Sequence, residues 1–254
     1  MTTVLKTEEL RKQFGDLVAV DDVSLEIGGE EITSIIGPNG AGKTTFYNLL
    51  TGVLEPSSGS IWLGKEGDLR EITDDPPHEV ARNGLSRSYQ ITNIFEGLTV
   101  RENVQVARIT HEGRTFDFRS RAAKDEELNE DVDELLALTN LTELAETPCE
   151  TLSHGEKRNV EIALALAIEP TVFLLDEPTA GMNPTETREI VSLIRELDED
   201  IDATFVVTEH NMDVVTDISD RIVVLAEGAV LADGEPREVL SDERVTEAYL
   251  GSEA

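Results

Sequence analysis

A glycine-rich segment at residues 37–45 constrains this chain more than any other feature. It reads Gly-Pro-Asn-Gly-Ala-Gly-Lys-Thr-Thr and matches the phosphate-binding pattern G-x-x-x-x-G-K-[ST]. A β-rich run at 31–36 precedes it, and a helical run at 44–50 follows it. Because the pattern binds nucleotide phosphates in this strand–loop–helix context, we predict a nucleotide site in an α/β fold.

The chemistry of this phosphate-binding loop explains its residue types. Glycines let the backbone curl so that its N–H groups face phosphate oxygens, and the positive end of the following helix adds to the attraction. Lys43 supplies charge to the β- and γ-phosphates, and Thr44 offers a hydroxyl to Mg²⁺. A glycine-rich turn with a chance lysine is the alternative, which the combined features disfavour. The predicted phosphate-binding residues are Gly37, Pro38, Asn39, Gly40, Ala41, Gly42, Lys43, Thr44 and Thr45.

A second element, at residues 172–177, ends an apolar strand in two carboxylates. It reads Val-Phe-Leu-Leu-Asp-Glu. An Asp-Glu pair at a strand end is usually the solvated start of a loop, but beside a phosphate-binding loop it favours catalysis. We expect Asp176 to orient the Mg²⁺ shell and Glu177 to polarise the attacking water as a general base.

Composition restricts the class of protein. The 53 acidic and 21 basic residues give a net charge of −32, which repels phosphate backbones and disfavours nucleic-acid binding. We interpret the charge as a solvated acidic surface, such as halophiles use in a salty cytoplasm. The single cysteine excludes an intrachain disulfide, and no apolar stretch is long enough to span a bilayer. The chain is expected to be soluble and to act at a membrane only through a partner.

Strand and helix patterns predict how the chain is organised. Short buried strands at 172–175 and 204–207 flank a helix at 184–197, whose start Asn183 and Glu186 would cap. This alternation favours a mostly parallel sheet. We also expect strands at 4–11, 23–27 and 60–63, a hairpin at 222–225 and 229–231, and helices at 99–107 and 121–138.

One segment, at residues 152–158, indicates which family of phosphate-loop proteins the chain resembles. It reads Leu-Ser-His-Gly-Glu-Lys-Arg, opens an apolar helix, and resembles the L-S-G-G-Q signature of ATP-binding cassette (ABC) proteins. The resemblance implies that this signature contacts ATP. Read from the residues alone, Ser153 is a helix cap with Glu156 as its capping-box partner, and both readings can hold together. The signature residues are Ser153, His154, Gly155 and Glu156.

Other ABC landmarks follow in the expected order. Phe14 resembles the aromatic residue that stacks on adenine, although a core aromatic is an open alternative. Gln90 resembles the glutamine that touches Mg²⁺ and water, and His210 resembles the switch histidine at the γ-phosphate. Residues 180–184 resemble the D-loop. The chain departs from the usual pattern at His154, Glu156 and Asn183.

The resemblance implies a fold and its parts. It implies an α/β nucleotide-binding core with a mostly parallel sheet, an N-terminal antiparallel β subdomain and an inserted helical subdomain. We expect one ABC ATPase domain at 1–254, with the core and β subdomain at 1–92 and 166–254 and the helical subdomain at 93–165.

The finer pattern is similar to the ATP-binding subunits of branched-chain amino-acid importers. The run Val-Glu-Ile-Ala at 160–163, the D-loop, the segment at 209–213 and the tail to 251 carry this similarity. It implies an ATPase that uses ATP and Mg²⁺ at the cytoplasmic face of the membrane. The implied partners are a second ATP-binding subunit, identical or not, two membrane permeases and an extracellular substrate-binding protein.

Three alternatives stay open. Importers of urea and short amides share much of the pattern. A soluble ABC ATPase of DNA repair or translation is disfavoured by the acidic charge and by the lack of tandem cassettes. A small-molecule kinase is disfavoured by the signature and by His210.

Overall fold

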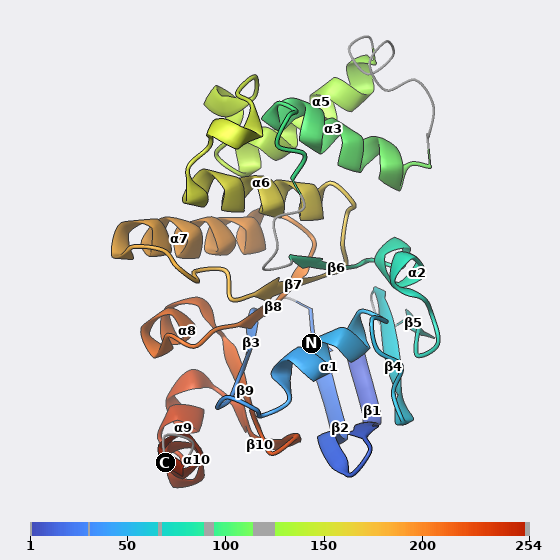
Figure 1. The fold of residues 1–254 in the computed structure, drawn as a ribbon, viewed down its shortest axis with the longest axis vertical. Helices are drawn as coiled ribbons and strands as arrows, with labels where there is room; N and C mark the ends of the chain where they lie inside the picture. The colour runs from blue at the N-terminus through green and yellow to red at the C-terminus, as the bar shows by residue number, and fades with distance from the viewer. Residues whose placement is uncertain (1, 30, 66–67, 89–93, 114–124, 252–254) are drawn as a thin grey trace.

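The computed structural model describes residues 2–29, 31–65, 68–88, 94–113 and 125–251 of the chain (Figure 1). A six-stranded sheet carries the predicted nucleotide motifs, with the strand order β10-β9-β3-β8-β7-β6. All its neighbouring strands pair in parallel except β10, which pairs with β9 as an antiparallel edge. The mostly parallel sheet is therefore confirmed. Its strands are β3 (Thr33–Ile36), β6 (Leu85–Ser88), β7 (Val172–Asp176), β8 (Thr204–Thr208), β9 (Arg221–Ala226) and β10 (Ala229–Gly234).

A second, antiparallel sheet comes from the N-terminal part of the chain. Its order is β2-β1-β4-β5, with β1 at Thr3–Phe14, β2 at Leu17–Gly28, β4 at Ser58–Lys65 and β5 at Asp68–Glu71. The expected antiparallel β subdomain is thus confirmed. The edge strand β5 was not predicted, because Asp-Leu-Arg-Glu has little of the apolar alternation that marks a half-buried strand.

Alternating side chains of β7 belong to two different cores. Val172 and Leu174 of β7 pack toward the antiparallel sheet and α1 (Lys43–Leu50), which lies between the two sheets. Phe173 and Leu175 pack on the opposite face, against α6 (His154–Leu166) and α7 (Pro184–Asp200) (Figure 1). Successive side chains of a strand point to opposite faces, so a fully apolar strand has to be covered on both.

The inserted helices form a separate apolar cluster above the sheet in Figure 1. It joins α3 (Val100–His111), α5 (Glu126–Leu138) and α6, and Leu128, Val132 and Leu136 of α5 are buried in it. Side chains of α6 also pack against the sheet core. The helical subdomain is present, and its boundaries at 93 and 165 stay a prediction.

The remaining elements were not predicted. Three short helices cover β9 and β10: α8 (Met212–Ile218), α9 (Pro236–Leu240) and α10 (Glu243–Gly251). A further helix, α2, spans Pro77–Arg82, and two single-turn 3₁₀ helices lie at Thr142–Leu144 and Cys149–Thr151. In the part of the chain that the structure describes, we find no helix with the length and hydropathy of a membrane span.

Candidate functional site

The phosphate-binding loop joins β3 to α1 and depends on its glycines. Gly37, Gly40 and Gly42 all have positive φ, at 154°, 82° and 101°. A Cβ atom at Gly42 would also collide with the carbonyl oxygen of Ala19, at the edge of the antiparallel sheet. A residue with a side chain would therefore be strained at this position both by its φ and by the neighbouring backbone.

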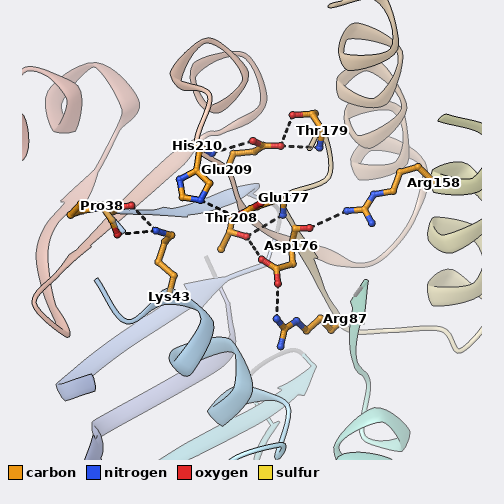
Figure 2. Close-up of polar contacts among 11 residues, drawn as sticks. Pro38, Lys43, Arg87, Arg158, Asp176, Glu177, Thr179, Thr208, Glu209 and His210 are labelled. Carbon is orange, nitrogen blue, oxygen red and sulfur yellow. Dashed lines mark hydrogen bonds and ion pairs between the residues drawn. The ribbon is translucent and has the colours of Figure 1, made fainter. Parts of the chain in front are cut away.

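Lys43 folds back over this loop. Its Nζ donates to the carbonyl oxygens of Gly37 at 2.6 Å and Pro38 at 3.1 Å (Figure 2). Burial lowers the pKa of Lys43, and the charges of Glu177 and Asp176 oppose that shift. The ammonium thus lies at the loop with two carbonyl partners, and phosphate oxygens could replace them.

Asp176 ends β7 and is held through both carboxylate oxygens. Its Oδ2 lies 2.6 Å from Nη2 of Arg87, and its Oδ1 accepts the hydroxyl proton of Thr208 at 2.7 Å. Parallel pairing places Asp176 beside Thr208, so the contact with β8 follows from the register of the sheet. Arg87 lies on the neighbouring strand β6. Three adjacent strands therefore fix the orientation of this carboxylate.

Glu177 and His210 form a carboxylate–imidazole pair at the carboxyl ends of β7 and β8. Nε2 of His210 lies 2.8 Å from Oε1 of Glu177. Glu177 has a φ of 47°, which is rare for a residue with a side chain, and its amide donates to the Thr208 carbonyl at 3.0 Å. Both side chains remain partly exposed, at 27% for Glu177 and 46% for His210. An acceptor for a water proton is thus available beside the phosphate-binding loop.

The signature segment opens α6, as predicted. The Ser153 side chain accepts from the amide of Glu156 at 3.3 Å, and Oε2 of Glu156 accepts from the amide of Ser153 at 2.7 Å. This capping box confirms the structural reading of the two residues. The same helix is tied to the site by Arg158, whose Nη2 donates to the Asp176 carbonyl at 3.1 Å. A role of Ser153, His154, Gly155 and Glu156 in binding ATP stays a prediction.

Two further predicted residues remain, Phe14 and Gln90. Phe14 is 46% exposed at the end of β1, so the alternative of a core aromatic is wrong. Nζ of Lys12 lies 5.2 Å from its ring centroid. Gln90 lies outside the described residues.

Arg87, Thr208 and Glu209 belong to this site but were not predicted. Each lies just before a predicted residue in the sequence: Arg87 precedes Gln90, and Thr208 and Glu209 precede His210. Their proximity to these residues in the sequence was the only signal that they belong to the site. Their contacts with residues of other strands can be identified only once the register of the sheet is known.

The residues present fit a divalent cation. The Thr44 side chain is exposed at the start of α1, and the Asp176 carboxylate retains 18% of its surface. Hydroxyl and carboxylate oxygens are the hard ligands that Mg²⁺ takes in phosphate sites, where it keeps several waters.

Comparisons with known proteins identify relatives along the whole chain. Residues 20–180 match the ABC transporter family, and residues 229–254 match the family described as branched-chain amino acid ATP-binding cassette transporter. The high-affinity branched-chain amino acid transport ATP-binding protein BraF of Pseudomonas aeruginosa is 40% identical, covering 98% of each chain. Its counterpart LivG of Escherichia coli is 38% identical, also covering 98% of each chain.

A solved structure agrees with the fold. The ADP conformation of an ATP-binding cassette from an ABC transporter superposes with a TM-score of 0.84 at 31% identity. The match covers 99% of this chain and 100% of that one.

Proposed function

This chain belongs to the ABC transporter family of ATP-binding proteins, and from that premise we propose that it hydrolyses ATP to energise the import of branched-chain amino acids. The observation that most supports ATPase activity is the 2.8 Å contact between His210 and Glu177, the residue that directly follows Asp176. Full-length similarity to branched-chain amino acid transport proteins supports the substrate class.

The chain's own groups divide the work of binding. Backbone N–H groups of the phosphate-binding loop and the Lys43 ammonium hold the β- and γ-phosphates. Thr44 and Asp176, with Gln90, would hold Mg²⁺, which supplies positive charge against the phosphate oxygens. Phe14 would stack on the adenine ring, for which its exposed side chain is available.

Hydrolysis then depends on the pair at the strand ends. The Glu177 carboxylate accepts a proton from the water that attacks the γ-phosphate, and His210 orients that carboxylate and contacts the γ-phosphate. Since this water must lie in line with the leaving oxygen, small errors in the placement of Glu177 lower the rate steeply.

The proposed assembly contains a second ATP-binding subunit. Its signature residues 153–156 would face the phosphates bound to this chain, so that two ATP molecules lie between the two subunits. Bound γ-phosphate favours the closed pair and hydrolysis releases it, which is a two-state equilibrium biased by a ligand. Two permeases and an extracellular binding protein would complete the transporter, with this chain at the cytoplasmic face of the membrane.

Uptake of labelled substrates tests the proposal. Cells or vesicles that contain the complete native transporter are compared with matched ones in which the Glu177→Gln variant takes the place of the native subunit. This variant preserves the size of the side chain. We expect leucine and valine uptake to need the native subunit and urea uptake to be independent of it. Loss of urea uptake with leucine uptake intact would contradict the substrate class and leave the ATPase assignment standing. Unchanged uptake of every substrate would contradict a transport role.

A further inference from the structure

Glu209 is a buried carboxylate that the mechanism above does not use. It lies between Thr208, the last residue of β8, and His210, and only 4% of its surface is exposed. Its Oε1 accepts the amide of Thr179 at 2.9 Å and the hydroxyl of Thr179 at 2.6 Å. Its Oε2 accepts the amide of His210 at 3.1 Å (Figure 2).

These contacts join the two segments that carry the catalytic pair. Thr179 lies two residues after Glu177, in a turn closed by the hydrogen bond from the Ala180 amide to the Glu177 carbonyl at 3.1 Å. Before this turn, the Glu177 amide is bonded to Thr208 of β8. The segment around Glu177 is therefore tied to the segment of His210 on both sides, once through Thr208 and once through Glu209.

The chemistry of the link requires a carboxylate. All three donors are neutral N–H or O–H groups that converge on two oxygens, and a carboxylate has acceptor sites for them on both. A glutamine of the same size would turn an NH₂ group toward at least one donor. With its oxygen toward Thr179 it would lose the bond from the His210 amide, and with its oxygen toward His210 it would lose the bond from the Thr179 amide, where only the Thr179 hydroxyl could accept from the NH₂ group.

We propose that Glu209 is a positioning residue for ATP hydrolysis, which fixes the backbone of His210 against the turn that follows Glu177. Without this link the His210 ring and the Glu177 carboxylate sample other separations, and the water is held less often in line. Nucleotide binding depends on the phosphate-binding loop, and within the described part of the chain the hydrogen bonds of the Glu209 side chain go to Thr179 and His210 rather than to that loop. The inference rests on the proposed ATPase activity, since it assigns a role within that reaction.

Four variants of the full-length chain test the link. Glu209→Gln breaks it at one oxygen, and Thr179→Val removes the hydroxyl while preserving the branched shape. Thr179→Ser keeps the hydroxyl and is the conservative counterpart of Thr179→Val. Glu31→Gln is the control for the loss of a buried carboxylate, because Glu31 is 6% exposed and pairs with Arg221 on another part of the sheet.

The measurements are kcat and KM for MgATP, with the melting temperature of each variant. We expect kcat to fall about 10- to 100-fold in Glu209→Gln and about tenfold in Thr179→Val, because displacements near 1 Å can cost that much. KM should stay within about twofold, since the ground-state contacts to ATP remain. Thr179→Ser, which keeps the hydroxyl, should have the native kcat, and so should Glu31→Gln.

The outcomes separate the inference from the function on which it rests. A native kcat for Glu209→Gln and Thr179→Val would overturn the inference alone. A fall in kcat that merely follows the melting temperature, with Glu31→Gln equally impaired, would also overturn it, because a general loss of stability would then explain the effect. A native chain without any turnover would overturn the proposed ATPase activity and the inference with it.

Discussion

Arg87 and Asp176 form an ion pair of 2.6 Å between strands β6 and β7, although they are 89 positions apart in the sequence. The pair is shielded from water, with 6% of the Arg87 side chain and 18% of the Asp176 side chain exposed. Arg87 also donates to Asn48 of α1 at 2.7 Å and lies over the Tyr47 ring, 5.4 Å from its centroid. It thus connects the helix of the phosphate-binding loop to the carboxylate expected to orient Mg²⁺.

Removing one member of this pair should destabilise the nucleotide-free protein. Arg87→Met leaves the partly buried Asp176 carboxylate without its ion-pair partner, and we expect the free energy of unfolding to fall by about 1–3 kcal/mol. Arg87→Met combined with Asp176→Asn should be less destabilised, because no uncompensated charge remains. Urea unfolding of both variants measures the difference. Arg244→Met is the control, since it removes an exposed partner of Asp242 and should change stability little. Equal stability of Arg87→Met and the native chain would show that the pair contributes nothing.

Lys43→Ala should weaken nucleotide binding itself. Lys43 is the only cation in the loop at 37–45, and a charged hydrogen bond to phosphate is worth roughly 1.5–3 kcal/mol, so the Kd for ATP should rise at least about tenfold. Calorimetric titration measures it. Lys65→Ala is the matched control, because Lys65 lies at the end of β4 and pairs with Asp202. Native affinity in Lys43→Ala would count against the phosphate site.

Salt should stabilise the chain. With a net charge of −32, lowering the ionic strength extends the repulsion between acidic side chains over longer distances. We expect the melting temperature to rise markedly from low to molar KCl, and to rise much less in sorbitol of equal osmolality. A melting temperature that stays flat over the KCl series would remove the halophile interpretation.

Local signals predicted much of the fold. Strands β7 and β8 are apolar in their central residues. Helix α7 is preceded by Asn183, and the structure contains the capping box that Asn183 forms with Glu186. Such elements were recognisable because a few adjacent residues determine them. The helices α9 and α10 span only five and nine residues, which is too short a window for a helical pattern to be distinguished from other patterns. They were missed for that reason.

The candidate site was predictable where a motif is contiguous. Lys43, Asp176 and Glu177 lie in patterns that can be read directly from the sequence. Arg87 and Glu209 could not be found that way. Their roles depend on which strands are neighbours and in what register, as with the pairing of Asp176 and Thr208. That information comes from the packing of the whole chain rather than from any short segment.

The most direct test of the account is the simultaneous measurement of ATP turnover and bound nucleotide in Glu177→Gln. The amide preserves the shape of the side chain but removes the proton acceptor, so turnover should fall about 10²- to 10⁴-fold. Binding should persist, because Lys43 and the backbone of the phosphate-binding loop are unchanged, and dimers with trapped ATP should accumulate. Native turnover in Glu177→Gln would contradict the assignment of Glu177 as the general base, and with it the mechanism proposed for this chain.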